Sequence, residues 1–388
     1  MLGAIIGDIV GSTYEVLEIK ALQESPSKKR SYEDRIQILS SKTPLFNKNS
    51  SFTDDSILTI SIASAILKNE DYESSLRLFG NNELSKGLDH YGRLPFSPGF
   101  VKWLKKEKVG DSLGNGGAMR ISPIALYFDT FEEVLEETKK ATIPSHNSVE
   151  AIIGAQAVST AIYLASHHKS KEEIKNTISS LFSYNLQFDL NTLQHEYRFT
   201  SKTSNSIPQA IYCFLISDSF ENALRISLSI GGDSDTIAAI TCAISEAYYG
   251  IPSDLKEQAL TYLTPSYRSI VQDFYEEITL KKALSLVDIK DQYFLNYMKT
   301  HTKKYNIPEE TGIWGCFITK DDDNLIQEVK IIVPNIINEK TLLINIHEYT
   351  HAYEIYKRLG TIYDFNDIEE EQKARNNEDL YLKKRVIN

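Results

Sequence analysis

Two short acidic clusters in this sequence stand immediately before apolar segments. Residues 52–55 read FTDD and precede the apolar segment 56–67, and residues 231–236 read GGDSDT and lead into another at 234–250. Aspartate at a helix start is favoured by capping and by the helix dipole, so each cluster alone fits a helix N-cap. The dipole stabilises a carboxylate by only about 0.3–1 kcal/mol, however, whereas burying an ionised group costs several kcal/mol. Hard divalent cations would compensate, because carboxylates and threonine hydroxyls form an all-oxygen set suited to Mg²⁺ or Mn²⁺, and no His or Cys stands nearby to favour zinc.

A different metal-binding pattern stands near the end of the chain. His347, Glu348 and His351 form an HExxH sequence within a segment of helical period. A spacing of four residues puts both imidazoles on one face of a helix with Glu348 beside them, which is the arrangement of a zinc site. The alternative is a surface helix with two incidental histidines.

The spacing of apolar residues predicts the elements that must position the first set of groups. From residue 1 to about residue 286 apolar residues recur mostly at helical spacing, and the segments 56–67, 148–165 and 234–250 carry little charge on any face. Such helices are typical of the interior of a large bundle. We therefore expect an all-α domain at 1–295.

The pattern changes after about residue 295. Residues 312–320 and 325–333 are rich in β-forming residues and are separated by the turn-forming sequence DDDN, which predicts a hairpin. A helix is expected at 338–359, where Gly360 stands at the C-cap position, and a second helix rich in Glu and Lys follows.

A boundary between two domains is expected in the polar stretch 298–310. The second domain, at 305–388, would be small and of the α+β class. It would contain the HExxH sequence, whereas both acidic clusters belong to the first domain.

Composition and charge exclude several classes of protein. The 388 residues include 42 Lys and Arg against 53 Asp and Glu, so the net charge of −11 disfavours a broad nucleic-acid-binding surface. Cys213, Cys242 and Cys316 are far apart and form no CxxC motif, which favours a reducing cytoplasm over a disulfide framework. The first residues lack the basic region of a signal peptide, and the apolar stretch 151–165 is too short to cross a bilayer. We expect a cytoplasmic protein without a membrane partner.

Five motifs occur in the order found in one known family. They are Gly7-Asp8-x-x-Gly11 with Glu15, the FTDDS box, GNGGAMR at 114–120, Ser145-His146-Asn147 and GGDSDT at 231–236. Over residues 1–280 the chain resembles the ADP-ribosylglycohydrolases, the dinitrogenase-reductase-activating and ARH-type hydrolases. The resemblance implies an all-α fold that binds two Mg²⁺ or Mn²⁺ ions and cleaves the glycosidic bond of ADP-ribosylated proteins or small molecules. It implies metal ligands at Thr53, Asp54, Asp55, Asp233, Asp235 and Thr236.

The resemblance also implies catalytic and substrate-binding groups. Paired cations can hold the ribose hydroxyls and orient water toward the anomeric carbon, and a carboxylate beside them would accept the proton of that water. The base stays open among Glu15, Asp54, Asp55 and Asp233. The glycine loop and the His-Asn pair correspond to the part of the family cleft that contacts ADP-ribose: Ser112, Gly114, Asn115, Gly116, Gly117, Met119, His146 and Asn147.

The C-terminal part resembles the zincin metallopeptidases, because a hairpin precedes the HExxH helix and an acidic helix follows it. This resemblance implies one Zn²⁺ held by His347, His351 and a downstream carboxylate, with Glu348 as general base. We expect Glu371 as the third ligand, in preference to Glu369, Glu370 and Glu378. Two alternatives to the hydrolase remain: a zinc metallopeptidase targeted by a domain that recognises ADP-ribose, and a non-catalytic ADP-ribose-binding or immunity protein.

Overall fold

Helices form nearly all the regular structure described in the first three quarters of the chain, as the apolar spacing predicts. The computed structural model of the protein describes residues 1–25, 28–107, 109–305, 314–336, 338–361 and 367–385. Contacts between residues divide the chain into two compact units, Met1–Ile66 with Glu70–Val271, and Gln272–Asn388 with Leu67–Asn69.

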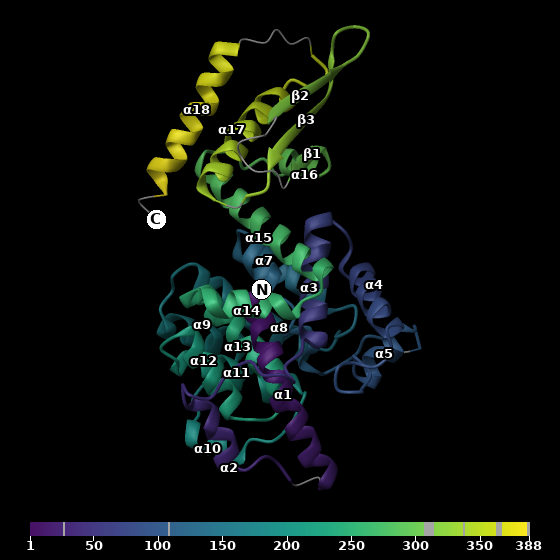
Figure 1. Cartoon of the computed structure of the whole chain (residues 1–388), viewed down its shortest axis with the longest axis vertical. Coiled ribbons are helices and arrows are strands. Elements are labelled where there is room, and N and C mark those ends of the chain that lie inside the picture. The colour runs from purple at the N-terminus through teal and green to yellow at the C-terminus, as the bar shows by residue number, and fades with distance from the viewer. Residues whose placement is uncertain (26–27, 108, 306–313, 337, 362–366, 386–388) are drawn as a thin grey trace. The chain divides into compact units, whose positions relative to one another are not determined.

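The first unit is built from helices of very different length (Figure 1). Their bounds are α1 Leu2–Glu24, α2 Tyr32–Ile36, η1 Gln37–Leu39, α3 Asp54–Lys68, α4 Tyr72–Ser85, α5 Pro98–Leu104, η2 Asn115–Gly117, α6 Ser122–Tyr127, α7 Phe131–Thr142, α8 Val149–Ser166, α9 Lys171–Phe182, α10 Leu190–Glu196, α11 Thr203–Ile216, α12 Phe220–Ser229, α13 Ser234–Tyr249 and α14 Ser253–Tyr262, followed by the start of α15 Pro265–Leu286. The expectation of a helical first domain is confirmed.

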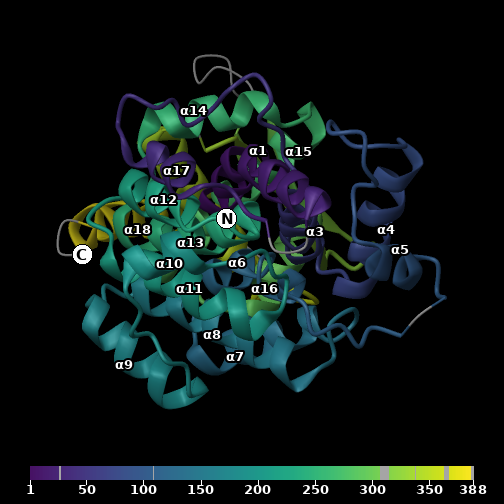
Figure 2. The same ribbon diagram turned by 90° about the horizontal axis from the view of Figure 1, so that it is seen from below.

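The centre of the first unit is α13, which packs against α1, α8, α11 and α12 (Figure 2). A row of glycines at every fourth position of α1 lets its backbone approach that of α13 closely. A Cβ atom added at Gly3 or Gly7 would lie 2.3 Å from the carbonyl oxygen of Cys242 or Ala238, and one at Gly11 would lie 2.5 Å from the Cα of Asp235. This close approach brings the start of α13 beside the middle of α1.

Helix α8 agrees with the predicted helical segment 148–165 and is longer than the apolar stretch 151–165 that was judged too short to cross a bilayer. Its 18 residues are long and apolar enough to cross a membrane by length and composition, and 56% of that window is buried within the protein. It packs against α7, α9, α11 and α13, which is the environment of a core helix in a helical bundle.

The second unit contains a three-stranded sheet in the order β1-β3-β2. Strands β2 (Gly315–Lys320) and β3 (Ile326–Pro334) pair antiparallel, as the hairpin prediction requires, with Cys316 opposite Ile331. Residues 312–313 of the predicted first strand lie outside the described residues. Strand β1 (Thr302–Tyr305) pairs parallel to β3 and was not predicted, because its sequence TKKY carries no apolar alternation.

Three helices complete the described part of the second unit: α16 Gln292–His301, α17 Glu339–Tyr356 and α18 Asp367–Lys384. Its core includes Leu284 and Phe294, from the end of α15 and from α16, together with Ile331 of β3 and Ile346 of α17. The contacts therefore place residues 272–301 with this unit, whereas the sequence assigned residues up to 295 to the first domain. The physical reason is that apolar side chains of α15 and α16 pack on the sheet and on α17.

Candidate active site

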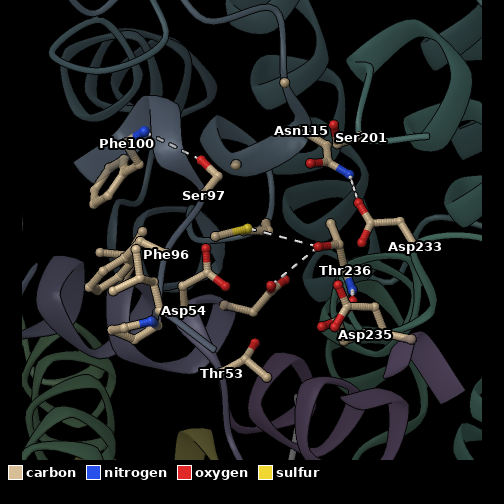
Figure 3. A pocket seen from close by; sticks show the side chains of 18 of the residues that line it. Thr53, Asp54, Phe96, Ser97, Phe100, Asn115, Ser201, Asp233, Asp235 and Thr236 are labelled. Carbon is tan, nitrogen blue, oxygen red and sulfur yellow. Dashed lines mark hydrogen bonds between the residues drawn. The ribbon is translucent and has the colours of Figure 1, made fainter. Parts of the chain in front are cut away.

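The two acidic clusters meet at the start of α3 and α13. Asp54 and Asp55 occupy the first turn of α3, and Asp235 occupies the first turn of α13 with Asp233 at its N-cap. Single oxygen atoms of Asp8, Asp55 and Asp235 lie within 4.8 Å of one another, and so do those of the group Glu15, Asp233 and Asp235. The predicted clusters are thus brought together by the fold, and the figure shows Asp54, Asp233 and Asp235 facing one space (Figure 3).

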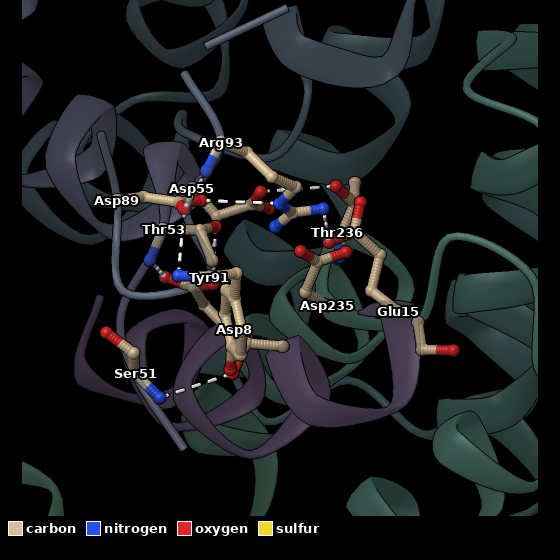
Figure 4. A network of polar contacts seen from close by, with 12 residues as sticks. Asp8, Glu15, Ser51, Thr53, Asp55, Asp89, Tyr91, Arg93, Asp235 and Thr236 are labelled. Carbon is tan, nitrogen blue, oxygen red and sulfur yellow. Dashed lines mark hydrogen bonds and ion pairs between the residues drawn. The ribbon is translucent and has the colours of Figure 1, made fainter. Parts of the chain in front are cut away.

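Asp8, on α1, fixes the FTDDS box in place. It is fully buried, and its carboxylate accepts hydrogen bonds from the backbone N–H of Thr53 (2.8 Å) and of Ser56 (3.0 Å), and from both hydroxyls (Figure 4). An aspartate of another helix therefore binds the Ser56 amide in the first turn of α3, which an N-cap side chain would normally bind, together with the amide of Thr53 just before the helix. The sequence motif contained Asp8, but its role was not predicted. An acid interrupting the apolar run MLGAIIGDIVG was the available signal.

The carboxylates of the cluster are held in unfavourable proximity. Burial, reinforced by the neighbouring acids, raises the pKa of Asp54 to about 8, and burial with the charge of Glu15 raises that of Asp233 to about 7. The pKa values of Asp55 and Asp235 rise well above the ordinary value, chiefly through burial and secondly through other acids of the cluster. One oxygen of Asp55 is also buried without a hydrogen-bond partner among the described residues. Oxygen atoms arranged in this way fit divalent cations.

A cavity of about 450 Å³ opens over the acidic cluster. Most of the site residues expected in this unit line it: Glu15, Thr53, Asp54, Asp55, Ser112, Gly114, Asn115, Gly116, Met119, His146, Asp233, Asp235 and Thr236. Gly117 and Asn147 are not among the described residues that line this cavity. Gly117 is turned toward the side chains of Thr142 and His146, and Asn147 lies exposed one residue beyond His146.

Two backbone amides of the glycine loop already bind groups of the protein itself. The amide of Gly114 donates to the Ser112 hydroxyl (3.1 Å), and that of Asn115 donates to the carbonyl of Ser201 (2.8 Å). The side chain of Asn115 instead reaches the acidic cluster, where its Nδ2 donates to Asp233 Oδ2 at 2.7 Å (Figure 3). The loop therefore connects the wall of the cavity to a predicted metal ligand.

The loop before α5 supplies a wall that the sequence reading missed. Arg93 pairs with Glu15 (3.1 Å) and with Asp89 (3.4 Å), and its guanidinium reaches toward the acids in the close-up (Figure 4). Phe96 and Phe100 lie across the cavity from Asp233 (Figure 3). The Gly- and Pro-rich sequence YGRLPFSPGF was the signal of a loop, but nothing in it indicated which residues would face the acids.

In the second unit, α17 and α18 bring together the histidines of the HExxH sequence and Glu371. The Nε2 atoms of His347 and His351 lie 3.1 Å apart, and Glu371 Oε2 is 3.3 Å from the first and 3.6 Å from the second. His347 Nδ1 and Glu378 Oε1 lie 2.7 Å apart and form a hydrogen bond. Burial raises the pKa of Glu348, opposed by His347. The side chains of Glu369 and Glu370 lie outside the described residues.

Comparison with known proteins decides the family of the first unit. A sequence profile for ADP-ribosylglycohydrolase matches residues 1–284. The chain belongs to the ADP-ribosylglycohydrolase family. It is similar to ADP-ribosylhydrolase ARH3 of Mus musculus (26% identity over 315 residues, covering 65% of this chain and 83% of the relative) and of Homo sapiens (25%, covering 65% and 84%). An ADP-ribosylglycohydrolase-related protein complex has a similar fold, with a TM-score of 0.50 and 17% identity, over 71% of this chain and 94% of that one.

Proposed function

We propose that the first unit hydrolyses the glycosidic bond of ADP-ribosylated substrates and that it does so with two Mg²⁺ or Mn²⁺ ions. The observation that carries the proposal is the convergence of Glu15 from α1, Asp55 from α3 and Asp235 from α13 on one cavity, with an oxygen of Asp55 that has no partner among the described residues. Membership of the ADP-ribosylglycohydrolase family and similarity to the ADP-ribosylhydrolases named above support the substrate class.

The residues present suit such ions. Asp55 and Asp235 stand near the middle of the cluster, and Thr53, Asp54, Asp233 and Thr236 offer further oxygen atoms around it. Divalent cations bound there would polarise a ribose hydroxyl and lower the pKa of a bound water. Asp8 is an unsuitable ligand despite its position, because its oxygens already accept four hydrogen bonds.

The side chains have separable tasks in this proposal. Glu15 is the carboxylate that we assign as proton acceptor, because it lines the cavity and, unlike Asp54, Asp55 and Asp233, is not one of the expected metal ligands; its ion pair with Arg93 holds it in position. Phe96 and Phe100 offer an apolar wall for the adenine, and the glycine loop with His146 contacts the diphosphate. Arg93 lies on the side of Glu15, where it would contact the group released from ADP-ribose.

The test measures metal binding and turnover on the full chain. Calorimetry with Mn²⁺ should show loss of binding in Asp55→Ala and Asp235→Ala, and release of ADP-ribose from a panel of peptides with different ADP-ribosyl linkages should fall at least a hundredfold. Asp189→Ala, which removes an exposed cap of α10, is the matched control and should retain both. Unchanged turnover in both cavity variants, with folding retained, would contradict the proposal. Metal-dependent ADP-ribose binding without turnover on any linkage would favour the non-catalytic alternative.

A second metal site is supported by the geometry of the second unit, and we propose that it binds one Zn²⁺. Ligand atoms about 2.0–2.1 Å from a tetrahedral zinc lie about 3.3 Å apart. The three distances between His347 Nε2, His351 Nε2 and Glu371 Oε2, 3.1, 3.3 and 3.6 Å, fit this value. Glu378 would orient His347 from behind, as carboxylates commonly do for histidine ligands.

Zinc bound there would supply a water molecule with a lowered pKa, and Glu348 of the HExxH sequence would take its proton, which makes a metallopeptidase the second candidate function. Elemental analysis of the full chain after dialysis should find one zinc, lost in His347→Ala and retained in His195→Ala, a control at an exposed histidine of α10. Glu348→Gln should keep zinc and abolish any peptidase activity, while ADP-ribosyl hydrolysis continues. A folded wild-type chain without zinc would contradict this second proposal.

A further inference from the structure

A buried arginine stands behind His146, and the cavity residues do not account for it. Arg120 is completely buried, and its Nε and Nη1 atoms have no hydrogen-bond partner among the described residues. Its Nη2 donates to the carbonyl of Ala141 (3.0 Å) and to the hydroxyl of Ser145 (2.8 Å). Burying a guanidinium with so few partners costs free energy. We therefore asked what its hydrogen bond to the Ser145 side chain does.

The contact continues to His146. Ser145 Oγ lies 2.8 Å from His146 Nδ1. An arginine can only donate, so Ser145 accepts from Arg120 and keeps its own hydrogen for another acceptor. Among the described residues, the acceptor in reach of that hydroxyl is His146 Nδ1. The imidazole nitrogen that accepts this bond carries no proton in the neutral ring.

The other ring nitrogen is directed at the glycine loop. A Cβ added at Gly116 would lie 2.9 Å from His146 Nε2, and one added at Gly114 would lie 3.7 Å from it. Both glycines and His146 line the cavity. Burial and the charge of Arg120 hold the pKa of His146 well below its ordinary value, which keeps the ring neutral.

From this arrangement we infer that Arg120 and Ser145 are positioning residues that fix His146 as the Nε2–H tautomer, so that it presents a permanent hydrogen-bond donor to an anionic or carbonyl oxygen of the ligand. The inference rests on the proposed function for the identity of that ligand, the diphosphate of ADP-ribose, but the tautomer itself does not. Without this relay His146 could also adopt the tautomer in which Nε2 carries no proton. The lone pair of that nitrogen would repel a phosphate oxygen.

The first experiment determines the tautomer in the ligand-free full chain. Long-range ¹H–¹⁵N correlation spectra of protein labelled at histidine should show Nδ1 as the unprotonated nitrogen and Nε2 as the protonated one, assigned by the loss of both signals in His146→Gln. This pattern should persist between pH 6 and 8. A wild-type His146 protonated at Nδ1, or at both nitrogens, overturns the inference.

The second experiment alters the relay without touching the cavity wall. Ser145→Ala should give a mixture of tautomers and weaken binding of ADP-ribose in proportion to the lost Nε2–H tautomer, about twofold for an equal mixture. Ser145→Thr keeps the hydroxyl and should restore both readouts. Ser159→Ala is the matched control, because Ser159 is also buried but donates to a carbonyl within α8. Retention of both the wild-type tautomer and the wild-type affinity in Ser145→Ala overturns the inference.

The two proposals fail in different ways. A protein that shows the Nε2–H tautomer, loses it in Ser145→Ala, and binds no ADP-ribose at any metal concentration contradicts the proposed function while supporting the positioning role. A protein that binds ADP-ribose with His146 protonated at Nδ1 supports the proposed function and contradicts the positioning role. Arg120→Gln checks the first step of the relay, since it should shift the tautomer in the same direction as Ser145→Ala.

Discussion

Removal of the Asp8 carboxylate should cost more stability than loss of any single helix cap, because Asp8 serves two amides of another helix. In Asp8→Ala the backbone N–H groups of Thr53 and Ser56 lose their acceptor, the first at a half-buried residue and the second at a buried one. A buried donor left without a partner costs about 1–3 kcal/mol, so the Ser56 amide accounts for that amount and the more accessible Thr53 amide adds a smaller cost. In a folding unit of this size each kcal/mol lowers the Tm by roughly 2–4 °C.

A matched pair of variants separates hydrogen bonding from charge. Asp8→Asn keeps one oxygen that can accept from both amides, and its NH₂ group can donate to the Thr53 hydroxyl, so more than half of the lost stability should return. Asp71→Ala removes the exposed cap of α4, which binds one amide, and should cost about 0.5–2 kcal/mol. Thermal unfolding followed by circular dichroism measures all three.

The same variants predict an effect of metal. In the metal-free protein Asp8→Ala also relieves repulsion of Asp54 and Asp55, which offsets part of the loss. With saturating Mn²⁺ this relief disappears, so the difference in Tm between Asp8→Ala and wild type should be larger with Mn²⁺ than with EDTA. A Tm for Asp8→Ala no lower than that of Asp71→Ala would refute the reasoning.

Three further expectations follow from the site. Without metal, the free energy of unfolding should fall as pH rises from about 4 to about 8, because Asp54 and Asp233 keep protons in the folded state that they release on unfolding. Each of the two contributes a slope of about 1.4 kcal/mol per pH unit between its unfolded and folded pKa. Unfolding scans with EDTA that show greater stability at pH 8 than at pH 5 would contradict this. Gly116→Ala should weaken ADP-ribose binding about tenfold in calorimetry, since the added carbon lies 2.9 Å from His146 Nε2, whereas Gly99→Ala has open space and should not. Asn115→Ala should weaken Mn²⁺ binding severalfold by freeing Asp233, and equal affinity in both proteins would count against that link.

The sequence allowed prediction of the acidic clusters because their chemistry is local. Two aspartates before an apolar segment form a pattern within a few residues, and the helix they begin is visible from its own period. The predicted grouping of His347, His351 and Glu371 drew on a similarly local four-residue spacing for the histidines. For Glu371 it also relied on the resemblance to the zincins, which implies a third ligand downstream of the HExxH sequence.

What the sequence could not supply was contacts between distant segments. Arg93 reaches Glu15 across 78 positions, and Asp8 reaches Thr53 across 45, and neither spacing follows from a helical or strand period. Strand β1 shows the same limit, because it is a short polar edge strand whose partner comes later in the chain. Such residues are fixed by packing, which a single sequence does not display.

The row of glycines on α1 brings like charges close together, and the fold must resist their repulsion while no cation is bound. The turn that leads to Asp233 is held by a buried ion pair: Arg35 Nε binds Glu18 at 3.0 Å, and its Nη1 donates to the carbonyl of Ile230 at 2.8 Å. Gly231 follows with a φ of +74°, and a Cβ there would lie 2.4 Å from the Arg35 guanidinium carbon. An L-residue would be strained in this backbone conformation and would also displace the arginine, so the contact between this turn and Arg35 requires glycine. Asp233 and Asp235 are therefore held in place before any cation arrives, so cation binding can relieve the repulsion without first ordering its own ligands.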